Sequence, residues 1–380
     1  MVGEFKIIEV NFDELENINI NNEETKLLIV NKDDVKFEFL IRRKFSSKKL
    51  IIFGSGAYDN NKINLPVFQR YSWSDNFEEN LIFYNDPTLY LGDITLAWGY
   101  GTEKEHYLKI IGNILKRIIK IMNINNKDVG IYGSSGGGFM AIMLSTFIRG
   151  SKAIVNNPQT NIGRYHIRLI KKLFSLLYPE IELQKALSFY PERVNVVELF
   201  KKENYIPNII YFQNVASKFD MDNQFLPFIN ELRTINENYF YTKIDLRLYS
   251  NKHQNHSPLS KEKTIMLIKD SLDIKTKYTN ILEINNGEWI EFSKRKGYSL
   301  FRYSTKIDRN IIGKDYTIKI NNREIIIKKI ENIDSEGYGD IYTNGHLYIS
   351  ISHNEISKDG LLNEKNITDY FLKKTVSIYY

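Results

Sequence analysis

The sequence predicts an α/β fold, in which a mostly parallel sheet carries helices on both faces and a helical insert, followed by a small all-β domain. Between about residue 48 and residue 275, apolar strand-like runs alternate with helix-like runs. After residue 275, short β-branched and aromatic runs are separated by Asn-Gly, Asn-Asn and Gly-Tyr-Gly turns, and helical patterning stops. We therefore place one domain at residues 1–275 and a second at residues 276–380.

Composition excludes several classes of protein. The chain has 380 residues, of which 42% are hydrophobic and 26% charged, so a folded protein with a sizeable core is expected. It has no cysteine, which excludes thiol catalysis, disulfides and thiolate metal sites, and we expect no metal site of any kind. The net charge of +6 is spread along the chain among acidic residues, which indicates a solvated surface and not a nucleic-acid-binding one.

The sequence also carries no sign of export or of a membrane span. Its first residues lack a basic stretch followed by an apolar one, and no apolar run approaches the ~18 residues that a spanning helix needs. A cytoplasmic location is therefore the expectation.

The first 100 residues combine predicted strands with a long polar loop after Phe53 and an irregular aromatic segment at 89–101. Residues 1–48 hold short apolar runs between acidic and Asn-rich turns, which predicts an antiparallel meander. The continuous apolar run Leu50–Phe53 is typical of a central parallel strand, and another strand is expected from Asn80 until Pro87 ends it. A helix is predicted from Thr102, as its N-cap, to about Asn123.

The remainder of the first domain continues the alternation, with one interruption. Residues 160–205 read as two or three amphipathic helices, which we interpret as a cap over the site. The expected elements around this insert are a strand to Tyr132, a helix at 139–148, a strand at 151–158, a strand at 209–214, a helix at 222–234, a strand at 239–249 and a helix at 260–272.

One stretch points to chemistry. Gly133-Ser134-Ser135-Gly136-Gly137 fits G-x-S-x-G, the nucleophile elbow, and it lies between a predicted strand and a predicted helix. The glycines have a steric reason, because a serine on a strained turn needs neighbours without a Cβ. A phosphate-binding loop is the alternative, but no Gly-Lys-Ser/Thr follows and the glycine spacing does not fit G-x-G-x-x-G.

A serine nucleophile needs a histidine base and an acid that orients it, in the chain order Ser, Asp or Glu, His for this kind of turn. Asp220 and Asp222 follow the strand that ends at Asn214, and His253 and His256 follow the next strand. Asp220 is preferred because Asp222 lies where a helix N-cap is expected. His256 is preferred because the segment after it leaves room for the imidazole to reach back, although His253 follows its strand more closely.

Acyl chemistry also requires two donors for the developing oxyanion. The N–H of Gly136, at the start of a helix, is one candidate, and Ser55 in the Gly54-Ser55-Gly56 loop is the second. An ordinary tight turn is the alternative interpretation of that loop. Arg70 is a candidate for holding a phosphate or carboxylate of the substrate, with a solvated arginine as the alternative.

Over roughly residues 48–274 the chain resembles the α/β-hydrolase superfamily. The segment Tyr132 to Gly138, followed by a strand ending in Asn156-Asn157-Pro158-Gln159, is similar to members from bacterial surface-polysaccharide loci, including capsule O-acetyltransferases. Two further segments look like shared features of unknown role, Phe68 to Trp73 and Asn85-Asp86-Pro87-Thr88. Where Gly-Gly-His is usual in the superfamily, this chain has Asn251-Lys252-His253.

The resemblance implies a Ser-Asp-His enzyme that moves an acetyl group from acetyl-CoA, as co-substrate, to a sugar hydroxyl of a polysaccharide. From the residues we expect a serine-dependent acyl enzyme, acting on a small-molecule ester or thioester as hydrolase or O-acyltransferase, with no resident cofactor. The alternative is a catalytically inactive glycan-binding or assembly protein on the same fold. Hydrolysis or transfer, the donor, the acceptor and the oligomeric state are left open by the sequence.

Overall fold

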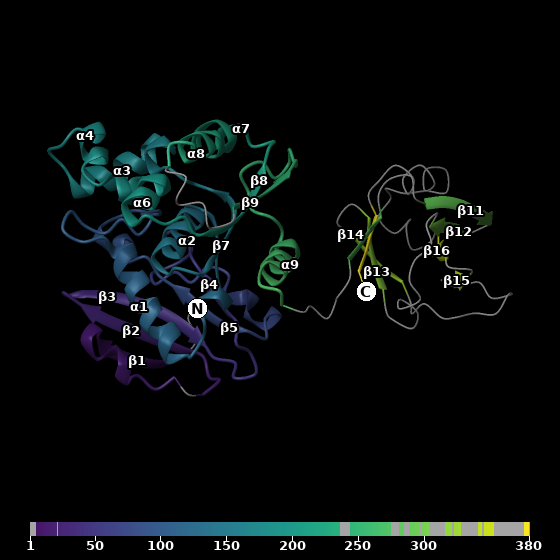
Figure 1. Cartoon of the computed structure of the whole chain (residues 1–380), viewed down its shortest axis with the longest axis horizontal. Coiled ribbons are helices and arrows are strands. Elements are labelled where there is room, and N and C mark those ends of the chain that lie inside the picture. The colour runs from purple at the N-terminus through teal and green to yellow at the C-terminus, as the bar shows by residue number, and fades with distance from the viewer. Residues whose placement is uncertain are drawn as a thin grey trace. The chain divides into compact units, whose positions relative to one another are not determined.

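The computed structural model describes residues 5–20, 22–235 and 244–274 in full, together with the backbone of the strands between residues 281 and 379. The chain divides into two compact units, Met1–Ile274 and Lys275–Tyr380, and each is described by itself. In the first unit a mostly parallel sheet is covered by helices on both faces, which confirms the predicted fold class (Figure 1).

The described part of the first unit contains a nine-stranded sheet in the order β1-β2-β3-β5-β4-β6-β7-β8-β9. Neighbouring strands run parallel except for the pairs β2/β3 and β3/β5. The strands are β1 (Lys6–Asn11), β2 (Lys26–Lys32), β3 (Val35–Arg42), β4 (Leu50–Phe53), β5 (Asn80–Tyr84), β6 (Val129–Ser135), β7 (Lys152–Pro158), β8 (Asn208–Asn214) and β9 (Ile244–Tyr249). The predicted strand at 239–249 is thus described from Ile244 onward, because residues 236–243 lie outside the described part.

The antiparallel meander expected for residues 1–48 is wrong at its first pair. β1 and β2 are parallel, with Lys6 opposite Lys26 and Val10 opposite Val30, and only β2 and β3 form an antiparallel hairpin. The connection between β1 and β2 contains the 3-10 helix η1 (Phe12–Asn17). It is long enough to return the chain to the end of the sheet at which β1 begins, so that β2 can run parallel to β1. A crossover of that length cannot be distinguished from a loop by apolar patterning alone.

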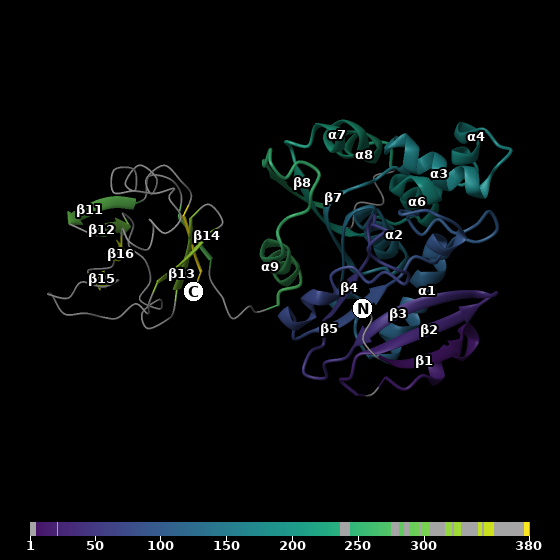
Figure 2. The ribbon, with the colours of Figure 1, turned by 180° about the vertical axis from the view of Figure 1, so that it is seen from behind.

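Two apolar layers hold the helices against the sheet. Alternate side chains of the central strands enter opposite layers, as the pleat of a strand requires. In β4, Leu50 and Ile52 join the layer under α1 (Tyr107–Ile121) and α2 (Gly136–Phe147). Ile51 and Phe53 join the opposite layer with α9 (Lys261–Ser271), which Figure 2 shows from behind.

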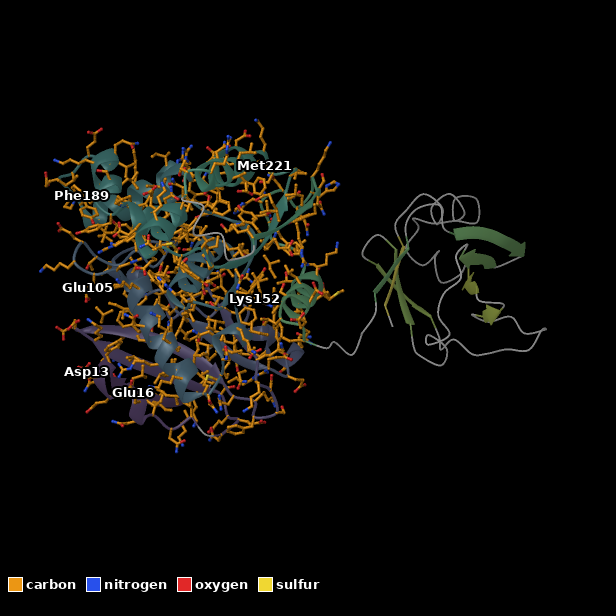
Figure 3. All side chains as sticks on the ribbon, in the orientation of Figure 1. Asp13, Glu16, Glu105, Lys152, Phe189 and Met221 are labelled. Atoms are coloured by element: carbon orange, nitrogen blue, oxygen red, sulfur yellow. The ribbon has the colours of Figure 1, made fainter. Side chains whose placement is uncertain are left out.

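Helix α1 begins four residues later than predicted, with His106 and not Thr102 at its N-cap position. Gly101 has a φ of 84°, and the segment after it closes a turn in which Thr102 N donates to Glu105 O at 2.9 Å. The Thr102 hydroxyl accepts from Glu105 N at 3.1 Å, so this threonine caps the turn and not the helix. Figure 3 shows Glu105 at the periphery of the first unit, and its carboxylate pairs with Lys32 at 3.0 Å.

The insert after β7 contains four short helices, where two or three were predicted. They are α3 (Ile167–Leu177), α4 (Leu183–Ser188), α5 (Pro191–Val194) and α6 (Val196–Glu203). Pro191 starts α5, and the Asn195 side chain caps α6 by accepting from Val197 N at 2.9 Å, so local signals divide the run. The apolar face of α6 joins the layer of α2, and this last helix therefore belongs to the body of the fold.

Three helical segments follow β8 in the chain. They are α7 (Lys218–Asp220), the π-helical turn η6 (Met221–Phe225) and α8 (Leu226–Leu232). Together with α3 and α4 they lie at the same end of this unit in both views (Figures 1 and 2). The loops that follow β6, β7, β8 and β9 leave from one edge of the sheet, because these strands are parallel.

In the second unit, the described residues form two four-stranded antiparallel sheets, with the orders β10-β17-β13-β14 and β11-β12-β16-β15. The strands are β10 (Ile281–Ile284), β11 (Trp289–Arg295), β12 (Tyr298–Tyr303), β13 (Tyr316–Ile320), β14 (Arg323–Ile327), β15 (Ile341–Thr343), β16 (His346–Ser352) and β17 (Val376–Tyr379).

Within the ranges described above, none of the helices combines the length and the apolar character that a membrane crossing demands.

Candidate active site

The turn between β6 and α2 has the geometry of a nucleophile elbow. Ser135 has φ 53° and ψ −127°, a conformation that L-residues seldom adopt and that is common at functional sites. A Cβ on Gly133 would lie 2.0 Å from the carbonyl oxygen of Gly137, and one on Gly138 would lie 2.6 Å from Cβ of Pro158. Only glycine permits strand and helix to approach this closely, and the approach presents Ser135 at the edge of the sheet.

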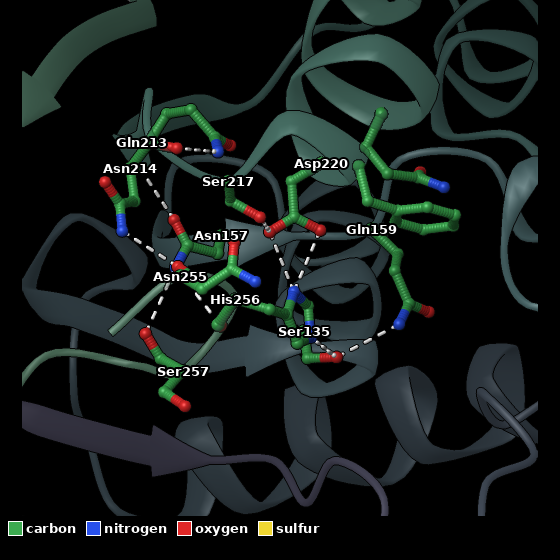
Figure 4. Close-up of polar contacts among 12 residues, drawn as sticks. Ser135, Asn157, Gln159, Gln213, Asn214, Ser217, Asp220, Asn255, His256 and Ser257 are labelled. Carbon is green, nitrogen blue, oxygen red and sulfur yellow. Dashed lines mark hydrogen bonds and ion pairs between the residues drawn. The ribbon is translucent and has the colours of Figure 1, made fainter. Parts of the chain in front are cut away.

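Two of the predicted polar residues lie against Ser135. His256 Nε2 is 2.9 Å from Ser135 Oγ, and His256 Nδ1 is 2.8 Å from each carboxylate oxygen of Asp220 (Figure 4). Asp220 is fully buried, and its Oδ2 also accepts from Ser217 Oγ at 2.6 Å. Because a carboxylate accepts hydrogen bonds, the proton lies on Nδ1 and the lone pair of Nε2 faces the serine hydroxyl.

The other member of each predicted pair lies apart from this cluster. His253 is exposed, and its backbone N–H donates to Asn251 Oδ1 at 3.0 Å. Asp222 lies inside η6, where its half-exposed carboxylate pairs with Lys218 at 2.6 Å, so it does not act as the expected N-cap. The extra residue of this π turn also directs Gln224 inward, where its amide oxygen accepts from Thr160 N at 2.8 Å.

Buried asparagines hold the loop that carries His256. Asn157 Nδ2 donates to the carbonyl oxygens of His256 at 3.2 Å and Ser257 at 3.3 Å, and Asn157 Oδ1 accepts from Asn214 N at 2.8 Å. Asn214 Nδ2 donates in turn to the carbonyl oxygens of Asn251 and Asn255, each at 2.8 Å. Both asparagines are almost fully buried, so their hydrogen bonds are made without competition from water.

The loop that carries Ser55 lies against the turn that carries Gly136. Gly136 is the first residue of α2, and its N–H therefore has no partner within the helix. A Cβ on the adjacent Gly137 would lie 3.2 Å from Gly54 O and 3.3 Å from Gly56 N, which places the 54–56 loop against the elbow. The Ser55 hydroxyl donates to Val67 O at 3.1 Å, so the backbone N–H of Ser55 is the group with which it could bind an oxyanion.

The segment Phe68 to Trp73 and Asn85 have structural roles beside this loop. Gln69 Oε1 accepts from Gly56 N at 3.0 Å, and Gln69 Nε2 donates to Ala57 O at 2.9 Å. Asn85 Oδ1 accepts from Val67 N at 3.0 Å. These bonds fix the loop that follows β4, which is the loop expected to bind the oxyanion.

Arg70 lies behind the elbow. Its Nη2 donates to Ser134 Oγ at 2.7 Å, and the guanidinium lies 5.5 Å from the ring of Trp73 and 5.1 Å from that of Tyr132. Nε and Nη1 are enclosed and have no hydrogen-bond partner among the residues that the structure describes. The same part of the chain supplies no carboxylate that pairs with this cation.

Aromatic side chains from the insert border the site. The ring of Tyr165 lies 6.3 Å from the imidazole of His256, and those of His166 and Phe219 are stacked 4.4 Å apart beside it. Burial raises the pKa of the Tyr165 hydroxyl, and hydrogen bonding with Ser135 and Gln159 opposes that rise. His166 and Phe219 are exposed, so the shelf they form with Tyr165 lies between the cluster of Ser135, His256 and Asp220 and solvent.

One contact of the nucleophile was missed by sequence reasoning. Gln159 Nε2 donates to Ser135 Oγ at 3.0 Å, and Gln159 Oε1 accepts a hydrogen bond from Trp98 Nε1 (Figure 4). Gln159 directly follows the strand β7 and ends the segment Asn156-Asn157-Pro158-Gln159, in which sequence reasoning assigned it no role. Trp98 lies in an irregular segment far away in the sequence, which no periodicity connects to the site.

Comparison with known proteins gives structural neighbours only. No protein-family model matches the chain, and no curated protein matches it. Among solved structures it is similar to the capsule O-acetyltransferase of Neisseria meningitidis serogroup A. A mutant of that protein in complex with CoA is 18% identical, over 68% of this chain and 99% of that chain, with a TM-score of 0.50. Another structure of it is 17% identical over 68% and 98%, also with a TM-score of 0.50. At this level of identity the likeness concerns the fold.

From the hydrogen bonds of Asn157 we predict that a substitution there impairs the site, although Asn157 does not contact the reacting atoms. Asn157→Asp keeps the acceptor for Asn214 N but removes the donors to the His256 loop and adds a buried charge. We expect a loss of about 2 kcal/mol in the free energy of unfolding, with slower reaction of Ser135. Denaturant unfolding and fluorophosphonate labelling measure the two effects.

A matched control is Asn126→Asp, because Asn126 Nδ2 donates to Arg149 O at 2.9 Å in an exposed turn. This variant should change stability by no more than about 0.5 kcal/mol and leave labelling unchanged. Equal effects of the two substitutions would contradict a positioning role for Asn157.

Proposed function

We propose that this chain, which has the α/β-hydrolase fold, is a serine-dependent acyl enzyme. One observation carries the proposal: on a strained turn, Ser135 Oγ lies 2.9 Å from His256 Nε2, and His256 Nδ1 lies 2.8 Å from buried Asp220. A serine hydroxyl is a weak nucleophile until a base accepts its proton, and this geometry supplies the base and fixes its tautomer.

In the proposed reaction, Ser135 Oγ attacks the carbonyl carbon of an ester or thioester while its proton passes to His256 Nε2. Asp220 stabilises the imidazolium by accepting from Nδ1. The carbonyl oxygen becomes negatively charged, and the N–H groups of Gly136 and Ser55 are proposed to bind it. Collapse of this intermediate expels the alcohol or thiol with the proton from His256 and leaves an acyl group on Ser135.

The second half of the reaction decides between hydrolase and acyltransferase. Water as acceptor makes an esterase, and a sugar hydroxyl makes an O-acyltransferase. The fold likeness to a capsule O-acetyltransferase with bound CoA supports acetyl-CoA as donor and a polysaccharide as acceptor. The aromatic shelf of Tyr165, His166 and Phe219 also supports transfer, because the ring of Tyr165 beside His256 and the ring of Phe219 next to it disfavour water at the acceptor position.

A catalytically inactive glycan-binding protein is the second candidate, and the site argues against it. Ser135 has a strained backbone, and Asp220 is a buried carboxylate held by His256 and Ser217. Strain and a buried charge both cost stability, and binding alone requires neither of them.

The triad is tested by covalent labelling. A fluorophosphonate probe should label the wild-type chain, and Ser135→Ala should abolish the labelling because the nucleophile is lost. His256→Ala should slow labelling by about 10³-fold or more, whereas His253→Ala, at an exposed position, should leave the rate unchanged. Labelling that survives Ser135→Ala would place the nucleophile elsewhere, and a folded wild type that does not react would contradict the acyl-enzyme proposal.

Arg70 is proposed to attract an anionic part of the donor or of the glycan. Because its Nε and Nη1 are enclosed, we propose that it acts mainly through its unpaired charge and less through direct hydrogen bonds. Arg70→Met should therefore raise KM for acetyl-CoA about threefold to tenfold at low salt, and by less at high salt.

The control substrate for Arg70 is p-nitrophenyl acetate, which is uncharged and should keep its KM. Arg70→Lys retains the charge and should restore most of the affinity for acetyl-CoA. If Arg70→Met impaired both substrates equally, the residue would support the elbow and would not select an anion.

A further inference from the structure

Gln159 gives Ser135 a second polar partner besides the base. Its side-chain Nε2 lies 3.0 Å from Ser135 Oγ, and its backbone N–H donates to Ser135 O at 3.1 Å. Gln159 is fully buried, so its amide cannot exchange these bonds for bonds to water. The serine oxygen therefore contacts His256 on one side and a fixed amide N–H on the other.

The orientation of that amide is set by Trp98. The indole Nε1–H is a donor only, and it is directed at Gln159 Oε1, so the NH₂ group of Gln159 must face Ser135. Trp98 is fully buried and has a φ of 55°, an uncommon backbone conformation for so bulky a residue. A costly conformation that directs an indole at this amide indicates a functional constraint.

The strained backbone at Trp98 is held by the segment Asn85-Asp86-Pro87-Thr88, which sequence reasoning marked without a role. Asp86 Oδ2 accepts from Gly99 N at 2.7 Å, and Asp86 Oδ1 accepts from Thr88 N at 2.9 Å. Asp86 is buried, and burial raises the pKa of its carboxyl while these hydrogen bonds oppose the rise. A continuous series of contacts thus runs from Asp86 through Trp98 and Gln159 to the nucleophile.

We propose that Gln159 is a further catalytic residue, which donates a hydrogen bond to Ser135 Oγ as negative charge develops there, and that Trp98 and Asp86 are its positioning residues. The inference rests on the proposed acyl-enzyme function. In the resting state Ser135 Oγ donates its proton to His256 and accepts from Gln159.

The contribution of Gln159 follows from the charge on Oγ during both steps. In acylation the Oγ–C bond forms, the proton passes to His256 Nε2, and the C–S or C–O bond of the donor then breaks. In transfer the acceptor oxygen bonds to the acyl carbon and gives its proton to His256, the C–Oγ bond breaks, and Oγ takes that proton back. Because a hydrogen bond to a charged oxygen is stronger than one to a neutral oxygen, Gln159 stabilises the transition states more than the resting serine.

Gln159→Met tests the proposal, since methionine is similar in size but cannot donate. Two rates are measured per titrated active site: phosphonylation of Ser135 by the fluorophosphonate probe, and kcat with p-nitrophenyl acetate. We expect both to fall about tenfold with little change in KM, because the lost bond acts on the reacting oxygen. Counting active sites by titration separates this loss from any loss of folded protein.

Gln213→Met is the matched control. Gln213 is also fully buried, and its Nε2 donates to Asn214 O at 3.0 Å without contacting Ser135. It should keep the wild-type rates per titrated site even if its unfolding temperature falls. Wild-type rates in Gln159→Met would overturn the inference while leaving the acyl enzyme intact, whereas an unreactive wild type would overturn the proposed function itself.

The role of Trp98 is tested by combining a substitution of Trp98 with Gln159→Met. Trp98→Phe removes the indole N–H that orients Gln159, so the single variant should show part of the Gln159→Met loss. The double variant should react no more slowly than Gln159→Met alone, because Trp98 acts through that amide. Multiplied losses in the double variant would show that Trp98 does not act by positioning Gln159.

Discussion

The close approach of β6 and α2 at Ser135 is the constraint on which the rest of the site depends. Glycine at 133 and 138 permits the approach, and Ser135 accepts a backbone conformation that costs free energy to hold. The parallel order of β6, β7, β8 and β9 then brings four loops to the same edge. Each loop supplies one group to the site: the Gly136 amide, Gln159, Asp220 and His256.

Buried polar groups hold this arrangement. Asn157 and Asn214 fix the His256 loop, Ser217 supports Asp220, and Trp98 orients Gln159. A buried network of this kind stabilises one geometry when every member is satisfied, and a single unsatisfied member is costly. Arg70 has two enclosed nitrogens that lack partners among the described residues, and these are the reason to propose a ligand charge nearby.

Much of the site followed from the sequence because its parts leave local signals. The glycines around Ser135 mark a strained turn, and the order Ser, Asp, His along the chain matches loops that parallel strands must bring together. Local reasons favoured His256 over His253 and Asp220 over Asp222, but the contacts of His256 with Ser135 and Asp220 required coordinates, since each pair lies within a single loop. Gln159 and Trp98 could not be paired, because their contact joins two irregular segments that no periodicity relates.

The fold, like the site, could be predicted from the sequence only in part. Apolar alternation predicted the central strands and the helices on both faces, but it could not reveal that β1 and β2 are parallel, because direction depends on the path of the connection. In the insert, apolar periodicity located helices, whereas Pro191 and Asn195 divided them and packing assigned α6 to the body.

The central claim is that Ser135 carries the acyl group between donor and acceptor, and trapping that intermediate tests it most directly. The chain would be mixed with acetyl-CoA, quenched in acid and analysed by peptide mass spectrometry, with and without a polysaccharide acceptor. The account predicts one acetyl group on the peptide that contains Ser135, absent in Ser135→Ala and lost as acetyl appears on the acceptor. Acetylated polysaccharide that forms with Ser135→Ala, or an acetyl group on another residue, would contradict it.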